Sequence, residues 1–140
     1  MNIILDLNIL LSALIKDSIT RKTIVSSNLR FYFPEPSLDK INKYKNYIIQ
    51  KSGLSETEYL RGLTILFDHI QLVSKGEIID KWNKAKEIME KIDSEEVVFI
   101  ALALKIKDSI IWSDDTHFTK QNIIRVIKTK EIIKLFEKGD

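Results

Sequence analysis

The sequence has no cysteine and only two histidines. The lack of cysteine excludes a disulfide-based fold, a cysteine nucleophile, and thiolate sites for zinc or an iron–sulfur cluster. The two histidines, His69 and His117, lie far apart in the chain, which argues against a histidine-rich zinc site and against a Ser-His-Asp triad. A metal bound by this chain would take mostly oxygen ligands, which favours Mg²⁺ or Mn²⁺ over zinc or copper.

Long hydrophobic runs and glycine-rich phosphate loops are also absent. No apolar segment reaches the roughly 18 residues of a membrane span. No basic region precedes the apolar run near the N-terminus, so we expect a cytoplasmic protein without membrane association. The four glycines are scattered, which removes the main support for dinucleotide binding and for P-loop chemistry.

The composition that remains is that of a folded, well-charged chain. Of the 140 residues, 44% are hydrophobic and 30% are charged, which excludes a disordered chain. This length predicts one domain over residues 1–140. The net charge of +2 does not identify a nucleic-acid partner, but it is compatible with one.

Short β-branched runs alternate with amphipathic segments along the chain. The pattern predicts strands at residues 3–5, 29–33, 70–73, 109–112 and 123–127, and helices at 9–14, 38–49, 56–67, 78–92, 95–105 and 131–136. Ser55 and Glu58 have capping-box spacing at the start of the third helix. This alternation predicts a three-layer α/β/α domain with a mostly parallel central sheet.

Acidic side chains gather at one predicted edge of this sheet. Asp6 follows the first strand, Asp114 and Asp115 follow the strand at 109–112, and Asp93 and Glu96 lie at the start of the preceding helix. Because ligands collect beyond the carboxyl ends of parallel strands, we expect these groups to converge on one pocket. Clustered carboxylates repel one another, and a divalent cation relieves that repulsion. The constellation therefore implies Mg²⁺ or Mn²⁺, with phosphoryl chemistry as its purpose.

Each acid also has a structural interpretation. Asp6 is placed to cap the helix after it, and Asp93 and Glu96 have the spacing of a capping box. Asp114 and Asp115 suit a plain turn. The occurrence of three such groups at one sheet edge favours a site over separate caps and turns.

Three polar residues are supporting candidates for the same site. Asn8 and Ser113 are placed to hold a carboxylate or a metal-bound water, and His117 is placed to contact a phosphate. Alternatively, Asn8 caps a helix, Ser113 ends a strand, and His117 is a solvated loop residue.

Three segments resemble motifs of the PIN domain family. Residues 3–14 resemble its opening, in which Asp-x-Asn or Asp-x-Thr follows the first strand. Residues 95–104 resemble its acidic helix start followed by an Ala-Leu-Ala run, and residues 111–118 resemble its last acidic motif. Their order and spacing agree with the family from residue 1 to about residue 136.

This resemblance implies a PIN-like α/β/α fold and a Mg²⁺- or Mn²⁺-dependent ribonuclease that hydrolyses RNA phosphodiester bonds. It also implies a VapC-like toxin of a toxin–antitoxin pair, with an antitoxin partner and a homodimeric state. Carried over to this chain, it implies that Asp6 is the first metal ligand. Glu96 takes the third acidic position with Asp93 beside it. Asp115 takes the fourth position with Asp114 beside it.

The second acidic position departs from the family pattern. Related proteins place a glutamate, often two adjacent acids, early in the helix after Pro-Glu, and the corresponding pair here is Asp39-Lys40. Either Asp39 replaces the glutamate with a shorter reach, or Lys40 occupies the key position. His117 also stands where an acid is frequent. The alternative function is a catalytically impaired PIN-like module that binds RNA or a protein partner without cleavage.

Overall fold

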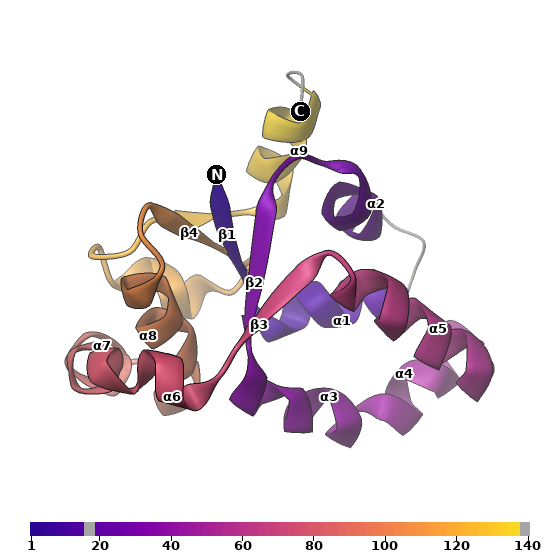
Figure 1. Cartoon of the computed structure of the whole chain (residues 1–140), viewed down its shortest axis with the longest axis horizontal. Coiled ribbons are helices and arrows are strands. Elements are labelled where there is room, and N and C mark those ends of the chain that lie inside the picture. Colours follow the sequence, from indigo (N-terminus) through magenta and orange to yellow (C-terminus); the bar gives the residue numbers. More distant parts are fainter. Residues whose placement is uncertain (16–18, 138–140) are drawn as a thin grey trace.

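Five parallel strands form the central sheet of this computed structural model, which describes residues 1–15 and 19–137 (Figure 1). The strands are β1 (Asn2–Leu5), β2 (Arg30–Pro34), β3 (Ile70–Val73), β4 (Ser109–Trp112) and β5 (Val126–Ile127). Their order is β3-β2-β1-β4-β5, and every paired strand in this order is parallel. The predicted α/β fold with a mostly parallel sheet is therefore confirmed.

Helices cover both faces of this sheet. Figure 1 shows one group on one side, comprising α6 (Lys75–Ile78), α7 (Trp82–Met89) and α8 (Val97–Lys105). The other side carries α1 (Leu7–Ile15), α2 (Ile19–Ser26) and α5 (Glu56–Phe67), and α9 (Thr129–Glu137) packs near α2. Because the sheet is covered on both sides, Ile3, Ile4 and Leu5 of β1 are all fully buried.

Helix α8 is the central helix of its layer. It contacts β1, β2 and β4, and its residues from Val97 to Ala103 are all buried. The ring of Phe99 makes edge contacts with Phe33 and Phe118. This packing fixes the position of the residues that immediately precede α8, which include Asp93 and Glu96.

The helix predicted at residues 38–49 is divided in two. Helix α3 (Leu38–Lys43) ends at Tyr44, and α4 (Lys45–Ser52) begins there and ends before Gly53, which has a φ of +72°. The Tyr44 N–H donates to the carbonyls of both Lys40 and Ile41, which tightens the last turn of α3. Helix α4 then packs against α1. Figure 1 shows α3 and α4 beyond the end of the sheet at which β2 finishes.

The helix predicted at residues 78–92 is also divided. Helix α6 begins after Ser74, whose side chain accepts a hydrogen bond from the Glu77 N–H. A 3₁₀ turn at Ile79–Lys81 separates α6 from α7, and the buried positions of the apolar stripe survive as Ile78, Ala85 and Met89. The apolar pattern thus marked the buried face only in part, since Ile79 is 51% exposed, and it did not reveal the break in the helix.

Other predicted boundaries are identical, shifted by one or two residues, or shortened. The strands at 70–73 and 109–112 and the helix at 56–67 have the predicted bounds, and the capping box of Ser55 and Glu58 is present. The last strand begins at Val126 because the N–H groups of Ile123 and Ile124 donate to the Gln121 side chain instead of to a neighbouring strand. Helix α2 and the 3₁₀ turn at Thr116–Lys120 were not predicted.

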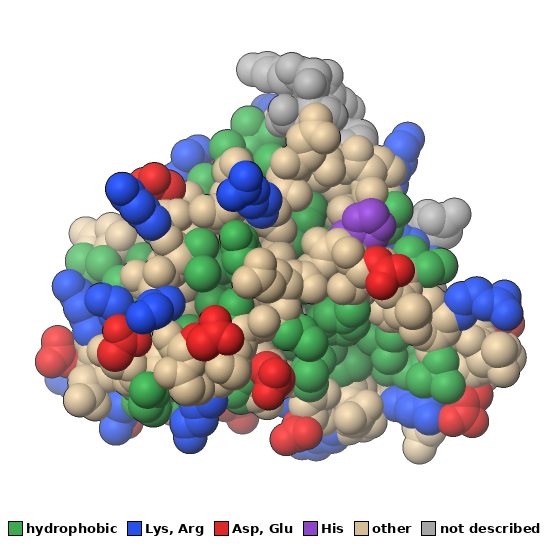
Figure 2. All heavy atoms as spheres, viewed as in Figure 1, with side chains coloured by type: hydrophobic (Ala, Val, Ile, Leu, Met, Phe, Trp, Pro, Cys, Tyr) green, Lys and Arg blue, Asp and Glu red, His purple; other side chains and the backbone are tan. Residues whose placement is uncertain are grey.

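An apolar groove lies between α3 and α5. Leu38, Ile41, Leu63 and Phe67 line it, and Figure 2 shows hydrophobic side chains gathered on this part of the face. In the part of the chain that the structure describes, the helices are too short or too polar to cross a lipid bilayer.

Candidate functional site

Asp6 lies at the carboxyl end of the central strand. Its backbone N–H donates to the Trp112 carbonyl at 3.1 Å, which continues the pairing of β1 with β4 by one residue. The Asp6 side chain is 1% exposed, and the hydroxyl of Ser113 donates to its Oδ2 at 2.7 Å. Burial raises the pKa of Asp6, and the hydrogen bond from Ser113 opposes part of that rise. Asp6 is therefore a buried carboxylate held by a neighbouring strand.

Glu96 is the most perturbed acid of the cluster. It ends the 3₁₀ turn at Ser94–Glu96, immediately before α8. Burial, and after it the charges of Asp6, Asp93 and Asp115, raise its pKa from 4.5 to about 8, while Lys40 lowers it. Its Oε2 is buried and has no hydrogen-bond partner among the described residues. A buried carboxylate oxygen in this state needs a proton or a cation.

Asp93, Asp115 and His117 form a second part of the same cluster. One ligand atom from each lies within 4.8 Å of the others. The Nδ1 of His117 lies 2.8 Å from Asp93 Oδ2 and 3.7 Å from Asp115 Oδ1. Asp93 Oδ1 also accepts from the Glu95 N–H at 3.1 Å. Asp93 thus caps the 3₁₀ turn with one oxygen, through the Glu95 N–H rather than the Glu96 N–H of the predicted capping box, and contacts His117 with the other.

The neighbouring acid Asp114 has different partners. Its two carboxylate oxygens accept from the backbone N–H and the hydroxyl of Thr129, at 2.9 and 2.6 Å, at the start of α9. The hydroxyl of Thr129 also accepts from Trp112 Nε1 at 3.0 Å. The Asp114 side chain therefore contacts the start of α9, whereas the Asp115 side chain lies near His117 and Asp93.

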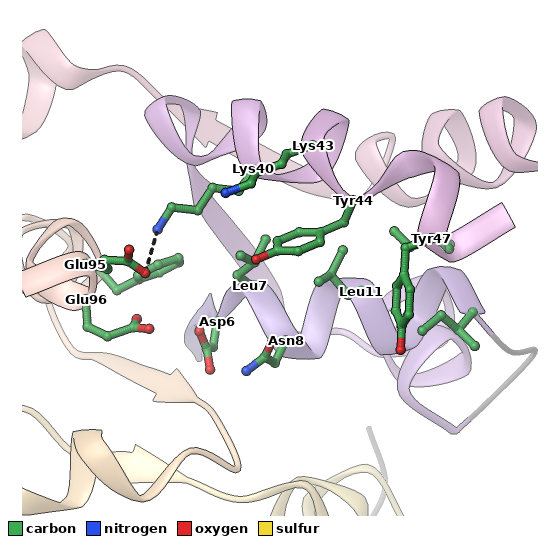
Figure 3. A pocket seen from close by; sticks show the side chains of 13 residues that line it. Asp6, Leu7, Asn8, Leu11, Lys40, Lys43, Tyr44, Tyr47, Glu95 and Glu96 are labelled. Atoms are coloured by element: carbon green, nitrogen blue, oxygen red, sulfur yellow. Dashed lines mark ion pairs between the residues drawn. The ribbon is translucent and has the colours of Figure 1, made fainter. Parts of the chain in front are cut away.

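Of the pair at the second acidic position, Lys40 is the residue that reaches the pocket. Its Nζ lies 3.8 Å from Glu95 Oε2, as Figure 3 shows, and it lines the cavity together with Asp6 and Glu96. Asp39 is exposed on α3. Asn8 is exposed as well and lines the same cavity.

The cavity extends from these carboxylates along α3 and α4, with a volume of about 380 Å³. Asp6 and Glu96 line one part of it, and Tyr44 and Tyr47 line another (Figure 3). Sequence reasoning placed Tyr44 on the apolar helix face and did not single out Tyr47. The spacing of Lys40, Tyr44 and Tyr47 by four and three residues was the available signal, because such residues share one side of a helix.

The side chains present fit a divalent cation. The charges of Asp6, Asp93 and Asp115 all act on Glu96, and its buried Oε2 lacks a partner among the described residues. The donors are carboxylate oxygens with one imidazole nitrogen beside them. Such a set suits Mg²⁺ or Mn²⁺.

Comparison with known proteins agrees with the fold. A search of curated proteins gives no match. The family model of the PIN domain matches residues 4–135, which includes every strand from β2 to β5 and the acidic residues described above. PIN domains are generally nucleases that use divalent metal and act on nucleic acid. Because the match covers nearly the whole sequence, this chain belongs to the PIN domain family.

Proposed function

We propose that this chain is a Mg²⁺- or Mn²⁺-dependent ribonuclease that hydrolyses RNA phosphodiester bonds. The observation that carries the proposal is the buried, unpartnered Oε2 of Glu96 beside Asp6, Asp93 and Asp115. A bound cation would satisfy this oxygen and relieve the repulsion that raises the pKa of Glu96. With no cysteine, and with both histidines outside any triad, metal-assisted hydrolysis is the phosphodiester chemistry best suited to these residues.

Asp6, Glu96 and Asp115 are the proposed ligands and catalytic residues, with Asp93 beside them. When bound, the metal polarises the scissile phosphate and lowers the pKa of a water. Ser113 orients Asp6 through its hydroxyl, and the backbone N–H of His117 orients Asp115 at 2.8 Å. Such hydrogen bonds keep ligand oxygens in position before the metal arrives.

A second function is supported by the position of Lys40. This ammonium, rather than the Asp39 carboxylate, faces the cavity and opposes the negative charge of Glu96. A cation at this position favours a module that binds RNA or a protein partner without cutting, because it competes with metal for the same carboxylates.

A cleavage assay distinguishes the two functions. Purified chain is incubated with mixed RNA in Mg²⁺, Mn²⁺ or EDTA, with Asp6→Asn as the test variant. Asp68→Asn is the matched control, since this exposed acid precedes β3 and lies at the amino-end edge of the sheet. The nuclease predicts metal-dependent cleavage that is lost only in Asp6→Asn. Cleavage that persists unchanged in Asp6→Asn contradicts the assignment, and a folded chain without cleavage supports the second function.

We further propose that the chain is the cytoplasmic toxin of a toxin–antitoxin pair, with an antitoxin partner and a homodimeric state. The apolar groove between α3 and α5 supports a protein contact, since Leu63 and Phe67 line it at the surface (Figure 2). Light scattering of the purified chain and of Leu63→Asp tests the dimer. A monomeric wild type would contradict it.

A further inference from the structure

We propose that Tyr44 and Tyr47 are base-stacking residues that hold single-stranded RNA along the cavity beside the carboxylate cluster. The inference rests on the proposed function and adds to it the side chains that would hold the substrate. It assigns a role to two aromatic residues that the metal chemistry does not use.

The two tyrosine rings are accessible and belong to the same cavity as the acids. Tyr44 is 38% exposed and Tyr47 is 55% exposed, whereas Tyr59 is 1% exposed in the core. Figure 3 shows the two rings in succession along the cavity, with Tyr44 nearer to Asp6. Both phenol rings are thus accessible from solvent next to the candidate cleavage centre.

An ammonium group lies over one face of each ring, so a base would stack on the other face. Lys43 Nζ lies 5.9 Å from the ring centroid of Tyr44. Lys51 Nζ lies 5.4 Å from the ring centroid of Tyr47 and donates to its hydroxyl at 3.1 Å. Stacking surfaces interleaved with cations are what proteins use to bind single strands, because the rings take bases and the cations take phosphates.

The order of these groups gives the RNA a path. Lys40, Tyr44 and Tyr47 follow one another at spacings of four and three on one side of the divided helix, which carries them away from the carboxylates. Lys40 Nζ lies 3.8 Å from Glu95 Oε2 and lines the cavity together with the acids. A phosphate near the cluster would therefore be followed by bases over Tyr44 and Tyr47.

This arrangement favours a single strand over a duplex. Stacking on a ring needs a base with a free face, and in an RNA helix those faces are covered by neighbouring bases. It also favours RNA over a peptide, because the cavity that carries the rings is the one that carries the proposed metal ligands.

Binding in EDTA tests the proposal without any cleavage. The probe is a short fluorescein-labelled single-stranded RNA of mixed sequence, and its anisotropy is titrated with the full chain. We expect Tyr44→Ala and Tyr47→Ala each to weaken binding about fivefold or more, the loss typical of a stacked base. Tyr44→Phe and Tyr47→Phe should keep most of the affinity, because they retain the ring.

Controls distinguish a loss of base stacking from misfolding and from a general loss of exposed apolar surface. Leu60→Ala removes another half-exposed apolar side chain, from α5, and should leave RNA affinity unchanged. Circular dichroism and urea unfolding check that each variant folds. The same RNA annealed to its complement should bind more weakly and show no dependence on either tyrosine.

Several results overturn the proposal. The first is that the alanine variants bind RNA as tightly as the wild type, or that the wild type does not bind RNA. The others are that the alanine variants lose equal affinity for duplex and single-stranded RNA, or that the phenylalanine variants bind as weakly as the alanine variants. Failure of the nuclease proposal looks different. In that case no metal would support cleavage, while the tyrosine-dependent binding in EDTA would persist.

Discussion

The Ser113 hydroxyl donates to the Asp6 carboxylate at 2.7 Å, and both side chains are buried at the carboxyl ends of adjacent strands. The same hydroxyl accepts from the Asp115 backbone N–H at 3.0 Å. One serine thereby fixes an acid that follows β1 relative to an acid that follows β4. Because it contacts both, Ser113 sets the spacing of two proposed metal ligands without being one itself.

Removing this hydroxyl should weaken the metal site. We expect Ser113→Ala to lower Mn²⁺ affinity or cleavage by about tenfold to a hundredfold, as is usual when a group that orients a ligand is lost. Ser109→Ala is the matched control, because the Ser109 hydroxyl on the same strand donates to the Ala103 carbonyl instead. Calorimetric titration with Mn²⁺ measures both variants. Equal Mn²⁺ affinity in the two would contradict the role of Ser113.

The neighbours Asp114 and Asp115 should respond differently to the same substitution. Asp115→Asn should abolish most metal-dependent cleavage, because its carboxylate faces His117 and the cluster. Asp114→Asn should lower the free energy of unfolding by about 1 kcal/mol or less, since one hydrogen bond loses a charged acceptor, and leave cleavage nearly intact. The reason is its pair of hydrogen bonds to Thr129 at the start of α9. Urea unfolding and RNA cleavage test the pair, and equal loss of cleavage would overturn the distinction.

The raised pKa of Glu96 predicts a pH-dependent stability in EDTA. The folded chain holds the Glu96 proton to about pH 8, whereas an ordinary glutamate releases it near 4.5. Between these values the unfolded state binds fewer protons, so the free energy of unfolding falls as the pH rises. Since the side chain is partly exposed, solvent screening limits the loss to about 1–2 kcal/mol.

Urea unfolding in EDTA at about pH 5 and about pH 8 measures this fall. Glu96→Gln should flatten the profile, and Mg²⁺ should restore the stability of the wild type near the upper pH. Glu95→Gln is a suitable control, because Glu95 is exposed at the adjacent position. A Glu96→Gln profile as steep as that of the wild type would show that other groups cause the dependence.

Local signals predicted the strands and much of the acidic cluster. Short, β-branched runs precede Asp6 and Asp115. This pattern is typical of strands in a parallel sheet that is covered on both faces. Because the strands of this sheet are parallel, the acids that follow β1 and β4 lie at the same edge, where the strands have their carboxyl ends. The helix before β4 then brought Asp93 and Glu96 to that edge.

Other features depend on contacts that no local pattern encodes. Whether Asp114 or Asp115 faces the site depends on Thr129, fifteen residues away from Asp114. The break at Tyr44 lies inside a continuous apolar pattern, so the sequence did not show that α4 turns toward α1. That turn places Tyr47 on the cavity, which is why the aromatic part of the site was missed.

Charge reversal at Lys40 tests its influence on the acids. Lys40 lines the cavity and lowers the pKa of Glu96, so it competes with a cation for the same negative charge. We expect Lys40→Glu to tighten Mn²⁺ binding about fivefold or more. A change of roughly 1 kcal/mol in the Coulomb energy between residue 40 and a bound metal has that effect. Calorimetric titration of the purified variant gives the dissociation constant directly.

Lys43→Glu provides the control for Lys40→Glu, because it makes the same change of charge on the same helix. Lys43 lies over the Tyr44 ring, and it is not among the groups that shift the pKa of Glu96. Equal tightening in both variants would mean that general charge, rather than the position of Lys40, controls the site. If the wild type is inactive and Lys40→Glu gains metal-dependent cleavage, Lys40 is the residue that separates an RNA-binding module from a nuclease in this chain.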